Sequence, residues 1–159
     1  MNHDSLCQAL IGFVRGIGIA VRCAPLGADC FLPGLDIGGG AVLVDAARLK
    51  YPGDILHEAG HLAVTAPEAR GAPKLEPTPG DEMTAIAWSY AAALYLGVDP
   101  ALVLHPHGYK GAGPSILENF TQGRYFGVPL LALYGMAVEP QRAIPGGPAP
   151  YPHMLRWLR

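Results

Sequence analysis

Residues 53–65 read GDILHEAGHLAVT and contain the pattern His-Glu-x-x-His, in which His57, Glu58 and His61 take the fixed positions. Apolar residues surround the pattern and prolines flank it, which favours a helix of about this length. On a helix, residues i and i+4 share one face, so both imidazoles can reach one metal ion. The intervening glutamate would lie where it can take a proton from water. We therefore expect a metal-dependent hydrolytic site on this helix.

The composition is that of a folded chain of modest size. It has 159 residues, of which 50% are hydrophobic and 15% charged, so one domain over residues 1–159 can bury a genuine core. A formal net charge of −2 offers no basic surface to nucleic acid. The sequence contains no run of 18 apolar residues, which is about the length that a membrane-spanning helix needs. Asp4 and Arg15 also make the first residues unlike a signal peptide. We expect neither a nucleic-acid nor a membrane partner.

The three cysteines are Cys7, Cys23 and Cys30. An odd number without a Cys-x-x-Cys pair argues against a thiolate zinc site and a disulfide framework. A Cys23–Cys30 bridge would need the two residues on neighbouring strands. We instead expect buried free thiols and a cytoplasmic protein.

The pattern of apolar and turn-forming residues predicts an α+β fold of the zincin-like kind. A small mixed or antiparallel sheet would pack against the motif helix and a second, ligand-bearing helix. Before the motif we expect an amphipathic helix over 4–16, a strand over 19–25, a short strand over 30–32, and a β-hairpin formed by 35–37 and 41–45 around three glycines.

After the motif, residues 66–80 are rich in proline and predict a surface loop, with Arg70, Lys74 and Glu76 in solvent. A second helix should run from about Asp81 to Leu96. We place the core at about 4–104 and a loop-rich C-terminal extension at about 105–159. Further elements are expected as follows: a short helix capped by Asp99, a loop over 105–108, a helix opened by the capping-box spacing Ser115 to Glu118, an apolar helix over 128–136, a Pro- and Gly-rich tail over 139–152, and a docked last turn over 154–159.

Catalytic zinc usually takes three protein ligands, so a third is needed. Glu82 is favoured because it follows His61 by 21 positions, which lets the chain turn and return antiparallel. Ala85 and Ser89 share its face and are small, so the two helices could approach closely. Glu82 could instead serve only the N-terminus of its helix. The other candidates for the third ligand are Asp81, His105, His107, Glu76 and Glu68.

Two further groups could take part in the chemistry. His105 and His107, in an exposed loop, could bind metal or donate to a developing oxyanion. Three tyrosines, Tyr109, Tyr125 and Tyr134, compete with them for the second role. The metzincin pattern is excluded, because Val64 stands where it requires glycine and Pro67 where it requires a third histidine.

Taken together, residues 4–96 resemble the ImmA/IrrE-type metallopeptidases, a gluzincin-like family. The resemblance rests on the order of elements, on the His-Glu-x-x-His helix, and on a second helix with Glu82, Ala85 and Trp88 at the family's spacing. It implies that His57, His61 and Glu82 bind Zn²⁺ and that Glu58 acts as the general base.

The sequence thus predicts a zinc metallopeptidase acting on a peptide or protein substrate. An extended substrate could add as a strand to the hairpin at about 35–45. Two alternatives remain open. The first is a zincin-like binding or regulatory protein with a structural or vestigial metal, in which His105 or His107 would close the fourth coordination position. The second is a zinc hydrolase that acts on a small molecule.

Overall fold

The computed structural model describes residues 2–159, which form a small α+β domain with a three-stranded mixed sheet and six α-helices. The sheet order is β1-β3-β2, with β1 (Ala20–Cys23) parallel to β3 (Ala41–Val44) and β2 (Leu35–Gly38) antiparallel to it. Gly39 and Gly40 join β2 to β3, and both have positive φ (56° and 75°). A two-residue hairpin turn of this kind follows the right-handed twist of its strands.

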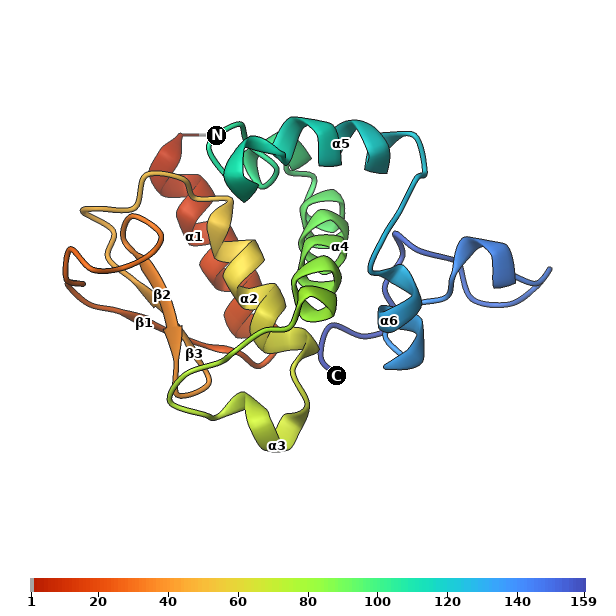
Figure 1. Ribbon diagram of the computed structural model, residues 1–159, viewed down its shortest axis with the longest axis horizontal. Coiled ribbons are helices and arrows are strands. Elements are labelled where there is room, and N and C mark those ends of the chain that lie inside the picture. Colours follow the sequence, from red (N-terminus) through yellow and green to blue (C-terminus); the bar gives the residue numbers. More distant parts are fainter. Residues whose placement is uncertain (1) are drawn as a thin grey trace.

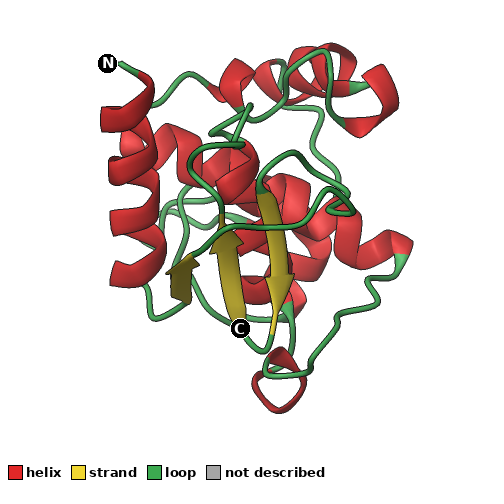
Figure 2. Cartoon of the chain, turned by 90° about the vertical axis from the view of Figure 1, so that its left-hand side faces the viewer, coloured by secondary structure: helices red, strands yellow, loops and turns green. Residues whose placement is uncertain are grey.

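Helix α2 (Asp54–Val64) lies at the centre of the domain. It packs against α4 (Pro79–Leu96) on one side and against α1 (His3–Gly16), β2 and β3 on the other (Figures 1 and 2). Ten of its eleven residues are buried, and only Glu58 is partly exposed. The motif helix is therefore enclosed by its neighbours, and only Glu58 is partly open to solvent.

Helix α4 is buried through its middle because its side chains are apolar or small all round, with every residue from Thr84 to Ala93 buried. Its close contact with α2 depends on Gly60. A Cβ atom on Gly60 would lie 3.0 Å from the Ala85 carbonyl oxygen and 3.2 Å from the Trp88 ring. The small side chains expected on this face of α4 thus allow the backbones of α2 and α4 to approach closely.

The segments after α4 cover the upper and right-hand parts of the domain in Figure 1. They comprise the short 3₁₀ turns η1 (Pro100–Leu102), η2 (Tyr109–Gly111) and η3 (Pro140–Arg142), and the helices α5 (Gly113–Thr121) and α6 (Val128–Leu133). The last residues return to the core. The Trp88 indole N–H donates to the Trp157 carbonyl (3.1 Å) and the Arg159 N–H to the Ala63 carbonyl (2.9 Å).

Most predicted elements are confirmed: the first helix, the first strand, the hairpin, the motif helix, its partner helix, the Asp99 cap and the apolar helix near 128. The short strand over 30–32 is wrong. Only an isolated bridge joins Leu32 to Leu35, because Pro33 and Gly34 (φ 73°) form a tight turn between them. The capping box at Ser115 is also wrong. Helix α5 already begins at Gly113, where Pro114 suits the first turn.

Three smaller expectations need correction. The 66–80 connection contains the single-turn helix α3 (Pro67–Arg70). Arg70 is half-buried, and its guanidinium donates to the carbonyls of Leu62 (2.8 Å) and Arg159 (3.0 Å). The cysteines are free, as expected, but none is fully buried and Cys23 is exposed. Within residues 2–159, no helix combines the length and the apolar character needed to cross a membrane.

Candidate metal centre

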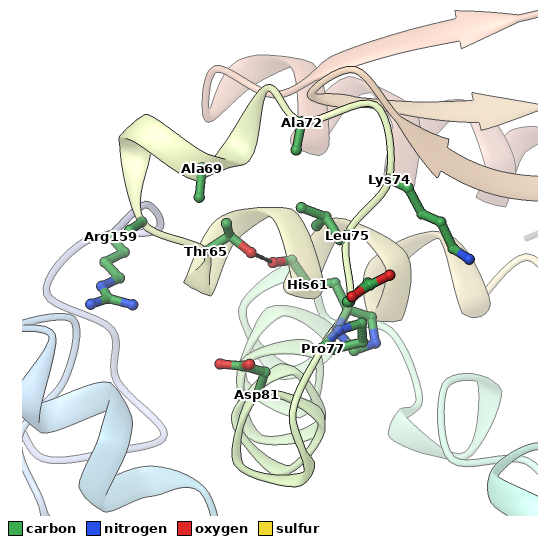
Figure 3. Close-up of a pocket in the computed structure, with 11 residues that line it drawn as sticks. His61, Thr65, Ala69, Ala72, Lys74, Leu75, Pro77, Asp81 and Arg159 are labelled. Atoms are coloured by element: carbon green, nitrogen blue, oxygen red, sulfur yellow. Dashed lines mark hydrogen bonds between the residues drawn. The ribbon is translucent and has the colours of Figure 1, made fainter.

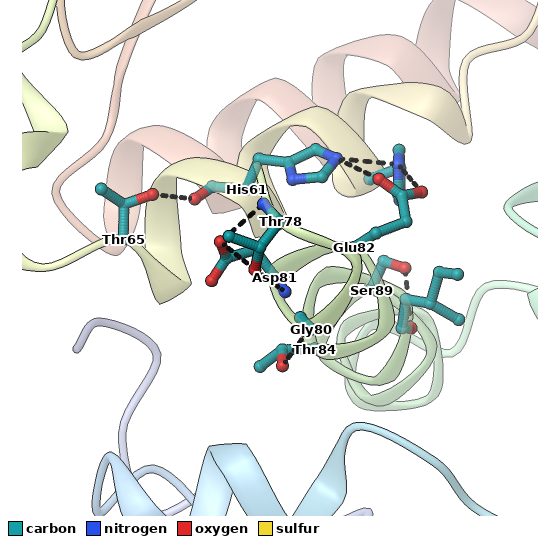
Figure 4. A network of polar contacts seen from close by, with 10 residues as sticks. His61, Thr65, Thr78, Gly80, Asp81, Glu82, Thr84 and Ser89 are labelled. Atoms are coloured by element: carbon teal, nitrogen blue, oxygen red, sulfur yellow. Dashed lines mark hydrogen bonds and ion pairs between the residues drawn. The ribbon is translucent and has the colours of Figure 1, made fainter. Parts of the chain in front are cut away.

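Three side chains converge between α2 and the first turn of α4. The Nε2 atoms of His57 and His61 lie 3.1 Å apart. One carboxylate oxygen of Glu82 lies 3.2 Å from His57 Nε2, and the other lies 3.1 Å from His61 Nε2 (Figure 4). Both imidazoles are buried, whereas the Glu82 side chain is 42% exposed. The cluster therefore faces solvent on the side of the glutamate.

These separations fit a shared metal ion. A tetrahedral zinc ion holds nitrogen and oxygen ligands at about 2.0–2.1 Å, which places neighbouring ligand atoms about 3.3 Å apart. The two Nε2 atoms lie close to that distance from each other, and each lies close to it from a different oxygen of the Glu82 carboxylate. The donors are two imidazole nitrogens and a carboxylate, a set found in catalytic zinc sites. In the described part of the chain, no other group of His, Cys, Asp and Glu side chains could hold an ion in this way.

The first turn of α4 separates the roles of its two acidic residues. Thr78 is the N-cap and Asp81 completes a capping box, because the Asp81 carboxylate accepts from the Thr78 N–H (2.9 Å) and from its hydroxyl (2.7 Å). Figure 4 shows Asp81 and Glu82 on different sides of the helix. With Asp81 serving the cap, Glu82 is free to reach the histidines.

The electrostatics of the cluster follow from burial and from these contacts. Hydrogen bonds from His57 and His61 hold the pKa of Glu82 well below its usual range, so it is a carboxylate at neutral pH. Burial by itself lowers the pKa of His61. The contact with Glu82 and the charge of Glu58 outweigh burial, so the net pKa is raised.

Glu58 lies in a different environment from Glu82. Burial raises its pKa, while the nearby His57 and His61 oppose the change. A carboxylate with a raised pKa and only partial exposure is a better proton acceptor than an ordinary surface glutamate. The arrangement therefore offers a base beside three side chains that could hold a metal ion.

The other candidate ligands lie elsewhere. Glu68 and Glu76 are exposed, on α3 and on the segment after it, and His107 is also exposed. His105 is buried, contrary to the exposed loop expected. Its Nε2 lies 2.9 Å from a carboxylate oxygen of Asp54, in the first turn of α2. Burial raises the pKa of Asp54, and the hydrogen bond to His105 opposes this.

The Asp54–His105 pair is a feature that sequence reasoning missed. Asp54 precedes His57 by one helical turn and so shares its face, and this spacing could have predicted its place near the cluster. Its partner lies 51 positions away, and no local pattern connects the two.

Among the tyrosines, Tyr109 lies against His57, with ring centroids 5.1 Å apart. Tyr125 packs with Phe120 and Tyr151, and Tyr134 packs under Arg159.

A cavity of about 340 Å³ opens beside His61 (Figure 3). Its walls come from the end of α2, from α3 and the segment after it, and from the start of α4. The lining combines small apolar side chains with two cations and two acids: His61, Thr65, Ala66, Ala69, Ala72, Lys74, Leu75, Glu76, Pro77, Asp81 and Arg159. One residue of the candidate metal cluster, His61, thus forms part of the wall of a cavity.

A scan against family models found no match for this chain, and searches of curated proteins and of solved structures found none either.

Proposed function

We propose that this chain is a zinc-dependent metallopeptidase of the ImmA/IrrE-like type that its sequence resembles. The observation that carries the proposal is the convergence of His57, His61 and Glu82 next to Glu58. The two Nε2 atoms lie 3.1 Å apart, and each lies 3.1–3.2 Å from one of the two Glu82 carboxylate oxygens. Bound zinc would supply Lewis acidity, acidifying water and polarising a carbonyl group. The order of elements from the first helix to the Glu82-bearing helix supports the resemblance.

In this proposal the protein groups have separate roles. His57, His61 and Glu82 hold the ion. Glu58 accepts a proton from the attacking water and returns it to the leaving amine. The raised pKa of Glu58, caused mainly by burial, brings it closer to the working pH and suits both steps.

The catalytic reading is favoured over a structural metal site by the count of ligands. A structural zinc site closes its fourth position with protein. In the described part of the chain the cluster comprises only three residues. His105, one candidate for the fourth ligand, is paired with Asp54 instead.

The cavity beside His61 is the place that we propose for substrate, because a residue of the cluster lines it. Its volume of about 340 Å³ suits a side chain or a short peptide segment. Strand addition at β2 is less favoured, because three N–H groups along this edge already have partners outside the β2–β3 ladder. Leu35 donates to the Leu32 carbonyl, Ile37 to the Asp36 carboxylate, and Gly39 to the Ala72 carbonyl.

The free cysteines suit a reducing compartment, and we propose a cytoplasmic location.

The test combines metal content with proteolysis. Purified protein should hold about one zinc per chain and cleave members of a quenched fluorescent peptide library. Glu58→Gln should keep the zinc and lose about 10²–10⁴-fold in cleavage rate. Glu68→Gln, which changes an exposed glutamate on α3, is the matched control and should cleave normally. Zinc without cleavage of any peptide would move the proposal to the binding or small-molecule alternatives, and absence of zinc binding would refute the metal site itself.

A further inference from the structure

Tyr109 lies at the beginning of η2, in the segment that leads into α5 and passes the N-terminal part of α2. Its ring meets the His57 imidazole at 84° with centroids 5.1 Å apart, which is an edge-on contact. The geometry is typical of favourable aromatic pairs. Tyr109 therefore forms a wall against one of the two histidines of the cluster.

The backbone is strained at this contact. Tyr109 (φ 54°) and the following Lys110 (φ 55°) both have left-handed conformations, and they are the two described residues other than glycine that do. Such a conformation is unfavourable for a residue with a side chain and persists only where the surroundings impose it. The His105–Asp54 contact of 2.9 Å, which ties the preceding residues to the first turn of α2, is one such constraint.

The usual way of fixing a ligating histidine is missing here. The second ring nitrogen normally donates to a carboxylate or carbonyl group, which sets the orientation of the ring. The Nδ1 atom of His57 is buried and has no hydrogen-bond partner. Besides the Glu82 contact at Nε2, packing must therefore hold the His57 ring in place, and Tyr109 and His61 are the rings that contact it.

We propose that Tyr109 is a positioning residue for His57. Its ring blocks rotation of the imidazole and keeps Nε2 directed at the ion shared with His61 and Glu82. The Asp54–His105 pair holds the strained segment in the position that this contact requires. The inference rests on the metal site proposed above, and it assigns the effect to the aromatic ring of Tyr109 and not to its hydroxyl.

The test measures zinc affinity by competition with a chromophoric chelator and records the visible spectrum of the cobalt(II)-substituted protein. Tyr109→Ala should weaken zinc binding by about 10–100-fold, as loss of an outer-shell partner typically does, and should change the cobalt spectrum. Tyr109→Phe keeps the ring and should restore both to near the wild-type values. Tyr125→Ala, which truncates a ring packed on Phe120 and Tyr151, is the control and should leave both unchanged.

Three results would overturn the inference. One is a Tyr109→Ala protein with wild-type zinc affinity and cobalt spectrum. Another is equal weakening in the Tyr109 and Tyr125 variants, which would indicate a general loss of stability. The third is a Tyr109→Phe protein as weak as the alanine variant, which would transfer the role to the hydroxyl. If Tyr109→Ala does not fold, Tyr109→Leu replaces it with the same expectation. Wild-type protein that binds neither metal refutes the metal site, and the inference with it.

Discussion

The adjacent acidic residues Asp81 and Glu82, at the start of α4, have different roles, and each role can be tested by a single substitution. Glu82 reaches both histidines, whereas Asp81 caps the helix through Thr78. Glu82→Ala removes one of the three proposed ligands, so zinc affinity should fall by more than the loss of about 10–100-fold that is typical of an outer-shell change. The measurement is a competition titration with a chelator of known affinity.

The neighbouring substitution is the control. Asp81→Asn weakens the capping box and should cost about 0.5–1 kcal/mol of stability, with zinc affinity unchanged. If the two variants lost zinc affinity equally, the helix start and not the Glu82 carboxylate would be the important feature.

Glu58 should reduce stability at neutral pH because its carboxylate is largely removed from solvent. Its pKa in the folded protein is raised above the ordinary value of 4.5, mainly by burial. The folded state then holds this proton to a higher pH than the unfolded chain does, so its contribution to stability falls as pH rises above about 4.5. Metal-free Glu58→Gln should be more stable than wild type at pH 7.5, on the order of 1 kcal/mol for each pH unit by which the pKa is raised.

Urea unfolding at pH 4 and pH 7.5, with chelator present, measures this effect. The two proteins should differ little at pH 4, where Glu58 is protonated in both states. A variant that is less stable than wild type at pH 7.5 would show that His57 and His61 stabilise the Glu58 charge more than burial opposes it.

Some residues in and around the cluster can be predicted from the sequence more readily than others. His57 and His61 follow from helical spacing, and Glu82 could be placed by the small residues on its helix face. The partner of Asp54 could not be found, because His105 comes from a loop whose path depends on tertiary packing. The capping role of Asp81 was accessible in principle, since Thr78 and Asp81 have the spacing of a capping box.

At the scale of elements, the distance between α2 and α4 sets the distance between the histidines and Glu82. Gly60 is the point of closest approach, with no room for a Cβ between it and Ala85. Gly60→Ala should lower stability by about 1–3 kcal/mol through overpacking. It should also weaken zinc binding, because the added methyl group pushes the helix that carries Glu82 away.

Gly12 in α1 provides the matched control. A Cβ atom there meets nothing within 4 Å, and alanine is favoured over glycine inside a helix by about 0.5–1 kcal/mol. Gly12→Ala should therefore raise the melting temperature and leave zinc affinity unchanged. Zinc affinity unchanged in Gly60→Ala as well would mean that the cluster tolerates movement between its two helices.

Element types were more predictable than element ends. The hairpin and the long helices have strong periodic patterns, and their glycines and prolines mark the boundaries. The errors in the predicted elements occur where a proline competes with another local sequence pattern. Pro33 turned an expected strand into a tight turn, and Pro114 allowed α5 to begin before Ser115. In the 66–80 connection, Arg70 was expected in solvent but binds carbonyl groups of α2 and of the last residue.

For the whole molecule, the last residues hold together segments that are far apart in the sequence. Trp157 packs with Phe13 of α1 and Trp88 of α4, and Arg159 joins the end of α2. Arg159 also lines the cavity beside His61. The helices that carry the cluster are thus joined both by these contacts and by the cluster itself.

A metal ion that bridges α2 and α4 must bind the folded state far better than the unfolded chain. At a free zinc concentration 100 times the dissociation constant, this preference stabilises the fold by about 2.7 kcal/mol. For a chain of this length, that corresponds to a melting temperature higher by roughly 5–11 °C. Thermal unfolding followed by circular dichroism, with zinc and then with excess chelator, measures the shift. The His57→Ala/His61→Ala double variant should show no shift, because it lacks two of the three ligands. An equal shift in that variant would place the stabilising zinc outside this cluster.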